Sequence, residues 1–207
     1  MVGHRQWGDP GSEKVRALVH NDSATVSRYY LLTSLGLLEL GWTPRGLRWL
    51  WWCRRVPAYA FACPTPFPTW LDRTMAMLRL YCEGRVVHFR GVPIDWSGFQ
   101  PFLRLVLKAC RSVPFGKTVS YQELAQKIGR PRAVRAVARA LATNPLPIVI
   151  PCHRVVRKNG NLGGYSAPGG IALKRRLLQM EKQAVLANAQ VAGITPISHV
   201  RLAVADR

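Results

Sequence analysis

The sequence predicts an α+β protein, in which a small N-terminal α/β domain precedes a mostly helical C-terminal domain containing a helix-turn-helix. Three observations lead to this prediction. Apolar segments separated by turn residues fill the first half, amphipathic helical spacing begins near residue 99, and positive charge concentrates in the second half. We expect domains at 1–94 and 95–183, followed by a C-terminal tail at 184–207.

The composition is that of a globular protein with a large excess of positive charge. Hydrophobic residues make up 48% of the chain and charged residues 19%. There are 30 lysines and arginines against 10 acidic residues, which gives a net charge of +20. Between residues 101 and 183 only Glu123 and Glu181 are acidic. Such a balance favours polyanionic partners, nucleic acid first and an anionic membrane second.

Membrane insertion and secretion are not indicated. The longest candidate span, Val56 to Leu71, is interrupted by four prolines, and the N-terminus lacks the apolar core of a signal peptide. We therefore expect an intracellular protein without a membrane partner. The five cysteines (Cys53, Cys63, Cys82, Cys110 and Cys152) form no CxxC pair, which suggests reduced thiols. Nothing in their spacing argues for a zinc site, and we predict no metal.

The N-terminal elements follow from turn residues and periodicity. Residues 1 to about 27 form a polar leader without a clear pattern. The chain is rich in Leu and Trp from Tyr30 to Trp52, and within it the segment LGLLELGWTPRGLRWLWW, residues 35–52, predicts two strands joined by a turn at Thr43–Gly46. A helix is expected from about Thr69 to Cys82, and a further strand and turn between Gly84 and Gly98. None of these elements points to a specific chemistry.

The C-terminal unit opens with three predicted helices. The first covers Phe99 to Cys110, where apolar residues recur at helical spacing. The second starts with a capping box, Ser120 as N-cap and Glu123 three residues later. Pro131 is expected in the first turn of the third helix, a position that proline favours.

The third predicted helix has two different faces. Val134, Val137 and Leu141 share its apolar side, and the opposite side carries arginines at positions 132, 135 and 139. Two short helices joined by a Gly-containing turn, the second with an arginine stripe, are typical of a helix-turn-helix. An ordinary helix pair with a solvated basic face is the alternative. Small residues such as Ala136 would let the helix backbone approach a groove floor while arginines contact phosphates.

The segment NPLPIVIPCHRVVRKNG, residues 144–160, places a cysteine at a rigid junction. Pro145, Pro147 and Pro151 fix the backbone around the short apolar run that precedes Cys152. His153 and the basic residues beyond it would lower the pKa of the thiol, the condition for a reactive thiolate. The alternative is that Cys152 is a small buried hydrophobic residue. The segment by itself leaves both interpretations open.

Three stretches carry a family resemblance: SYQELA, RAVARALATNPLPIVIPCHRVV and GGYSAPGGIALKRRLLQME. Together they closely resemble the O6-alkylguanine-DNA alkyltransferases, the methylated-DNA–protein-cysteine methyltransferases. The resemblance covers Phe99 to Glu181, while the N-terminal unit is only loosely similar and has no counterpart of the zinc ligands of some members. It implies DNA repair by direct, irreversible, single-turnover transfer of an alkyl group from O6-alkylguanine to the protein, without a cofactor.

The resemblance also assigns catalytic roles. Cys152 would be the nucleophile and His153 a base acting through a bound water, with Glu181 holding the imidazole. From its sequence context alone, Glu181 would be a surface acid near a helix end. Asn144 would bond to the hinge between the helix-turn-helix and the cysteine strand, and Tyr121 would donate to the purine as guanine leaves.

The implied partner is double-stranded DNA containing O6-alkylguanine, bound by a monomer through the minor groove in a DNA-associated, cytoplasmic, prokaryote-like setting. Arg135 would enter the base stack where the guanine has been extruded. The other implied DNA contacts are Ser120, Arg132, Ala136 and Arg139. The implied base pocket consists of Val155, Gly163, Gly164, Tyr165 and Ser166, with the carbonyls of Cys152 and Val155 accepting from the guanine amine.

Two other functions would use the same helix pair without chemistry. One is a DNA-binding regulator, although the sequence before Tyr30 has no cysteine cluster of the kind that regulatory family members use. The other is a damage-sensing protein that recruits repair factors, against which the set Cys152, His153 and Glu181 argues. An alkyl-transfer assay on Cys152→Ala would separate all three.

Overall fold

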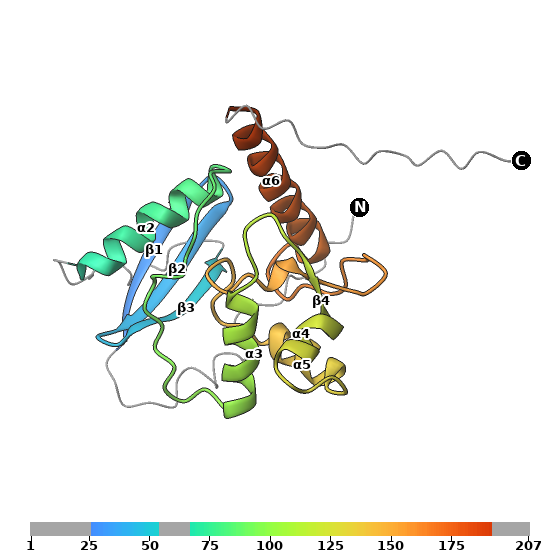
Figure 1. The fold of residues 1–207 in the computed structure, drawn as a ribbon. Helices are drawn as coiled ribbons and strands as arrows, with labels where there is room; N and C mark the ends of the chain where they lie inside the picture. The colour runs from blue at the N-terminus through green and yellow to red at the C-terminus, as the bar shows by residue number, and fades with distance from the viewer. Residues whose placement is uncertain (1–25, 54–66, 192–207) are drawn as a thin grey trace, which may run out of the picture.

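The computed structural model describes residues 26–53 and 67–191, and Figure 1 shows its arrangement. An antiparallel sheet and helix α2 form one side of the molecule, and helices α3, α4 and α5 lie together on the other. Helix α6 rises beside both parts. The α+β class and the mostly helical second half are as the sequence predicts.

The sheet has three strands in the order β1-β2-β3: Ser27–Thr33, Gly36–Thr43 and Gly46–Cys53. Thr43 pairs with Gly46, so the predicted turn between β2 and β3 is confirmed. The two predicted strands correspond to β2 and β3 and are confirmed, whereas β1 was not predicted. Strand β1 is at the edge of the sheet and leaves Arg28 and Leu32 exposed, so its sequence lacks the apolar continuity of a central strand.

Helix α2 (Thr69–Cys82) has the bounds that the sequence predicts. The strand expected between Gly84 and Gly98 was wrong: in this described segment only Ile94 makes a β-bridge, with Leu47. Side chains hold the segment instead. Arg111 donates to the carbonyls of Phe89, Arg90 and Val92, so these groups satisfy their hydrogen bonds without a neighbouring strand.

The second half contains α3 (Pro101–Arg111), α4 (Tyr121–Lys127), α5 (Val134–Ala142) and α6 (Gly170–Val191). The capping box of α4 is confirmed, because Glu123 N donates to Ser120 Oγ at 3.0 Å and Ser120 N to Glu123 Oε2 at 2.6 Å. Helix α5 begins at Val134 rather than at Pro131. Ala133 N donates to the carbonyl of Arg130 at 2.8 Å, which closes a separate turn around Pro131 before the helix starts.

One hydrophobic cluster extends from Leu31 of the sheet to Leu177 of α6. The two halves are also joined through the backbone, since Leu50 N in β3 donates to the carbonyl of Pro145 at 2.8 Å. The boundary between residues 94 and 95 stays a prediction. Helix α6 continues past residue 183, so the first residues of the predicted tail are helical, and residues 192–207 lie outside the described part.

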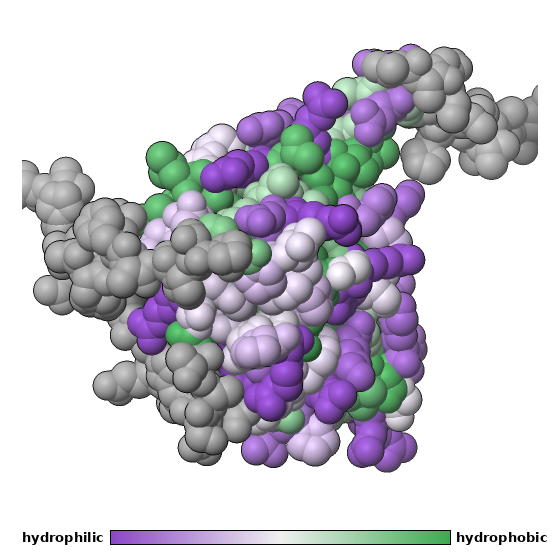
Figure 2. Space-filling model, turned by 90° about the vertical axis from the view of Figure 1, so that its left-hand side faces the viewer, coloured by the Kyte–Doolittle hydropathy of each residue, from purple (hydrophilic) through white to green (hydrophobic). Residues whose placement is uncertain are grey.

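The surface differs in polarity from end to end. In Figure 2 the large hydrophobic areas gather in the upper half, at the level of α2 and α6, and the lower half, at the level of α3 to α5, is mostly hydrophilic. The exposed Leu80, Val185 and Leu186 belong to α2 and α6. Among the described residues, no helix has both the length and the apolarity that a bilayer span requires.

Candidate active site and nucleic-acid interface

The backbone before Cys152 consists of turns, so the expected cysteine strand was wrong. Ile148 has a φ of 71°, in the left-handed region that β-branched residues rarely adopt. Ile150 N donates to the carbonyl of Leu146 at 2.8 Å, and Cys152 N to that of Ile150 at 2.8 Å. These bonds and buried side chains hold a conformation that costs about 1–3 kcal/mol. Cys152 then begins the short 3₁₀ helix η1, Cys152–Arg154.

The Cys152 thiol is buried, with 7% of the residue exposed. Asn144 fixes it from the side: its Nδ2 donates to Cys152 Sγ at 3.1 Å and to the carbonyl of Ile150 at 2.8 Å. Asn144 Oδ1 in turn accepts from Leu146 N at 3.1 Å. Asn144 therefore joins the backbone loop to the sulfur atom.

The expectation of a lowered thiol pKa was wrong for this structure. Burial raises the pKa of Cys152, and the Asn144 amide and the Lys174 ammonium oppose that rise only in part. The sequence suggested that several basic residues would act on the sulfur. Arg157 and Lys158 are exposed, however, and the guanidinium of Arg154 bonds to Glu181 instead.

His153 is fully buried and faces Glu181, with 2.8 Å between Nε2 and Oε1. Its other ring nitrogen, Nδ1, is buried without a hydrogen-bond partner in the described part of the chain. Burial lowers the pKa of His153, and the Glu181 carboxylate opposes this. The imidazole is therefore held neutral, with one nitrogen against a carboxylate and the other free to accept a proton.

Glu181 lies at the centre of a buried network rather than at the surface. Arg154 donates to both of its carboxylate oxygens, with Nη2 to Oε1 at 2.8 Å and Nε to Oε2 at 2.9 Å. The backbone N–H of Gly116 donates to Oε2 at 3.0 Å, and the hydroxyl of Tyr81 to Oε1 at 2.7 Å. Hydrogen bonds from His153 and Arg154 outweigh burial and lower the pKa of Glu181 to about 2.

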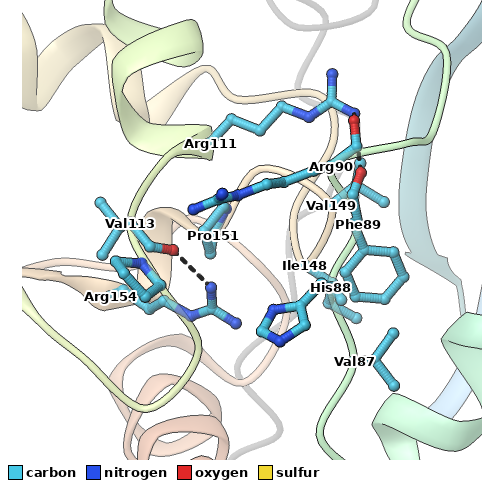
Figure 3. Close-up of a pocket in the computed structure, with 11 residues that line it drawn as sticks. Val87, His88, Phe89, Arg90, Arg111, Val113, Ile148, Val149, Pro151 and Arg154 are labelled. Carbon is cyan, nitrogen blue, oxygen red and sulfur yellow. Dashed lines mark hydrogen bonds between the residues drawn. The ribbon is translucent and has the colours of Figure 1, made fainter.

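Arg154 also lines a cavity of about 300 Å³, which Figure 3 shows. Its guanidinium donates through Nη1 to the carbonyl of Val113 at 2.8 Å. Ile148, Val149 and Pro151 contribute to the walls, opposite residues 87–90. None of the residues predicted to form the base pocket lines this cavity.

The predicted base-pocket residues differ in their exposure. Val155 is fully buried, whereas Ser166 and Gly164 are exposed. Burial raises the pKa of Tyr165, and its hydroxyl is buried without a partner among the described residues.

Gly163 and Tyr121 touch at the edge of this region. Gly163 has a φ of 70°, and a Cβ on it would lie 3.2 Å from the Tyr121 hydroxyl. A side chain at position 163 would therefore be strained and would crowd Tyr121, so the loop requires glycine here.

Lys174 was not predicted, yet it is fully buried beside these residues. Its Nζ donates to the carbonyl of Val155 at 2.6 Å and lies 5.9 Å from the ring centre of Tyr121. Burial lowers the pKa of Lys174 to about 8. The carbonyl of Cys152 likewise already accepts from Val155 N. Each carbonyl expected to accept from guanine thus has one donor in this structure and a second lone pair available.

The helix pair presents its basic face to solvent. Arg132, Arg135, Ala136 and Arg139 are exposed, while Val137 and Leu141 on the opposite side of α5 are buried. The predicted division into an apolar and a basic face is confirmed within α5, but Arg132 lies in the turn that precedes the helix. Ser120 is buried, and its hydroxyl caps α4, so a contact between its side chain and DNA remains a prediction. In the described ranges no cluster of His, Cys, Asp and Glu could hold a metal ion.

Residues 101–183 match the family described as 6-O-methylguanine DNA methyltransferase, DNA binding domain. A methylated-DNA–protein-cysteine methyltransferase of Methanothermobacter thermautotrophicus is 41% identical over 114 residues, 55% of this chain and 62% of that protein. Its Mycobacterium tuberculosis counterpart is 38% identical over 152 residues, 73% of this chain and 81% of that protein. The chain belongs to the methylated-DNA–protein-cysteine methyltransferase family.

A solved structure agrees with this assignment. The structure of Mycobacterium tuberculosis OGT in complex with DNA has a TM-score of 0.62 to this chain. The two are 35% identical, and the match covers 75% of this chain and 92% of that one. The similarity therefore extends beyond residues 101–183, which match the family's DNA-binding domain.

Three residues of this methyltransferase site were missed by the sequence analysis. Arg154 was taken only as a positive charge near the thiol, and Lys174 only as one of many basic residues. Tyr81 lies in a helix that carried no chemical signal. The spacing of seven between Lys174 and Glu181, two turns of one helix, could have indicated that both face the same interior. No local signal could have connected Tyr81 to a site so distant in sequence.

Proposed function

We propose that this protein repairs DNA by transferring the alkyl group of O6-alkylguanine to Cys152, once per molecule. The observation that carries the proposal is the buried set of Cys152, His153 and Glu181, in which Asn144 holds the sulfur. Family membership supports the same reaction. The arrangement provides a nucleophile, a base with a free nitrogen and a carboxylate that orients the base.

The thiol must lose its proton when the alkylated base binds, because burial keeps it protonated in the free protein. His153 Nδ1 is the acceptor, and a water between Sγ and Nδ1 would carry the proton. Glu181 stabilises the resulting imidazolium, as the carboxylate does in catalytic triads. The anionic sulfur then attacks the alkyl carbon.

In the transfer step a sulfur–carbon bond forms while the bond between carbon and O6 breaks, and its electron pair goes to the guanine. Tyr121, half-buried beside the loop of Gly163, would hydrogen-bond to the purine and compensate the charge of the departing guanine anion. The thioether product does not hydrolyse. The protein is therefore consumed in the reaction.

We further propose that one protein monomer binds the minor groove of duplex DNA through the exposed face of α5 and the turn that precedes it. Arg132 and Arg139 would contact phosphates, and Arg135 would occupy the space that the extruded base leaves. Ala136 would allow a close approach of the helix to the groove. Val155, Tyr165, Ser166 and the glycines of their loop would surround the extruded base.

Intact-mass measurement with peptide mapping tests the proposal. The protein is mixed with duplex DNA carrying one O6-methylguanine, and we expect one methyl group per protein, located on Cys152. Cys53→Ser is the matched control, because Cys53 is a half-buried thiol in β3, and it should be methylated like the wild type. Cys152→Ala should bind the DNA without gaining mass. Binding by the wild type without any mass gain would instead assign the protein to the regulatory or sensing class.

A further inference from the structure

We propose that Tyr81, supplied by helix α2 of the N-terminal half, is a positioning residue for alkyl transfer that holds His153 with Nε2 protonated and Nδ1 free. The inference rests on the proposed function of the Cys152 site. It assigns a role in that reaction to the part of the chain whose sequence indicates no chemistry.

The contacts of the Tyr81 hydroxyl carry the inference. The side chain is fully buried, and the hydroxyl lies 2.7 Å from Glu181 Oε1 and 3.2 Å from His153 Nε2. Tyr81 therefore touches both members of the pair that would act on the thiol. Its ring is held by edge contacts with Phe89 and Phe115, at 5.8 Å and 6.0 Å between centroids. These contacts leave the hydroxyl little freedom to choose another partner.

The geometry determines where the imidazole proton sits. Glu181 Oε1, 2.8 Å from His153 Nε2, is a carboxylate oxygen that can only accept. If Nε2 lacked a proton, two lone pairs would face each other at that distance inside the protein. Nε2 is therefore the protonated nitrogen, and the Tyr81 hydroxyl, which donates to Glu181, can share this N–H as a second acceptor. The lone pair on Nδ1 is left for the thiol proton.

Tyr81 also limits how strongly Glu181 attracts a proton on His153. By donating to Oε1, the hydroxyl disperses part of the carboxylate charge. Removing it should make the carboxylate a stronger partner for the imidazolium and raise the pKa of His153. The other ionisable groups around the pair are Arg154, Lys174, Tyr165 and the thiols of Cys152 and Cys110. A substitution at position 81 replaces none of these side chains.

The test compares Tyr81→Phe with the wild type and with Tyr29→Phe. Tyr29→Phe removes a hydroxyl from a tyrosine of strand β1. The ring of Tyr29 packs against Phe67 rather than against the site. Single-turnover methyl transfer is measured from pH 5 to pH 9. For Tyr81→Phe we expect the maximal rate to fall roughly three- to tenfold and the acidic limb to move upward by about one pH unit, a tenfold change in protonation equilibrium. Tyr29→Phe should match the wild type in both. An unmoved acidic limb in a folded Tyr81→Phe protein would overturn the proposal.

Side-chain ¹⁵N NMR of histidine-labelled protein gives a second test that needs neither DNA nor a stable variant. In wild-type protein His153 should show a protonated Nε2 and an unprotonated Nδ1. The opposite tautomer would overturn the proposal even if Tyr81→Phe failed to fold. Failure of the proposed function is distinguishable, because it would appear as a wild-type protein that leaves Cys152 unmethylated while this NMR signature is intact.

Discussion

The exposed face of α5 and the buried surroundings of Glu181 both depend on arginine, but in opposite physical settings. Arg135 and Arg139 on α5, and Arg132 in the turn before it, are exposed, and salt screens their attraction to phosphates. Arg154 is buried and donates to both oxygens of a single carboxylate. Replacing a single exposed arginine should therefore cost little stability. Replacing Arg154 should cost much more, because it neutralises the buried carboxylate of Glu181.

The largest expected effect comes from breaking the buried pair. Arg154→Leu leaves Glu181 charged and uncompensated in the interior, which should cost about 3–5 kcal/mol of stability. Urea unfolding of the free protein measures this loss. Arg157→Leu, an exposed arginine three residues later, is the matched control and should change stability by less than about 0.5 kcal/mol. Equal losses in the two variants would show that the buried pair has no special importance.

The second expected effect is a loss of folding stability in acid, which arises from the buried surroundings of Glu181 and not from the exposed arginines. The pKa of Glu181 is lowered to about 2 from an ordinary 4.5, so its stabilising contribution is complete above pH 4.5 and is lost as the pH falls toward 2. The pKa of His153 is also lowered, so neutral His153 favours the folded state above pH 6.5 and this contribution declines below it. Urea unfolding at a series of pH values should show stability decreasing by on the order of 2–3 kcal/mol between pH 7 and pH 3.

Glu181→Gln provides the control for this acid loss. The variant is less stable at neutral pH, but the part of the slope that arises between pH 4.5 and pH 2 should be missing. If the variant keeps the full acid slope, other carboxylates cause it.

The exposed face gives the smallest and most selective effects. Arg135→Ala should slow methyl transfer from duplex DNA by roughly ten- to a hundredfold, since base extrusion loses a compensating contact of a few kcal/mol. Transfer from the free modified base should be nearly unchanged. Arg139→Ala, on the same helix, should weaken DNA binding without this substrate difference and reduce the salt dependence by about one phosphate contact. Parallel slowing of Arg135→Ala on both substrates would contradict the role in base extrusion.

Local sequence patterns were sufficient for much of the fold. The turn at Thr43–Gly46, the bounds of α2 and the capping box of α4 each depend on residues close together in the chain, and each is confirmed. The errors arose where distant residues decide the local structure. Val87 and Phe89 are apolar at strand spacing, but contacts with Arg111 replace the expected strand pairing.

The candidate site divides in the same way. The motif around Cys152 singled out the sulfur, His153 and Asn144, which are neighbours in the chain and in space. The pKa of the Cys152 thiol was mispredicted, because basic residues near it in the sequence were expected to lower it. The sequence does not show that Arg154 points to Glu181 or that the thiol is buried. The contribution of Tyr81 could not be predicted, since it depends on the fold bringing Tyr81 of α2 within hydrogen-bond distance of Glu181 in α6.

The distances along the chain between bonded residues differ greatly across the molecule. Ser120 and Glu123 are 3 positions apart, whereas Tyr81 and Glu181 are 100 apart. Closing so long a loop opposes early formation of the second contact. The helix pair can therefore form before the reactive site, which is complete only after α6 has left the ribosome and docked. An unfinished copy thus carries a thiol that still lacks its oriented base.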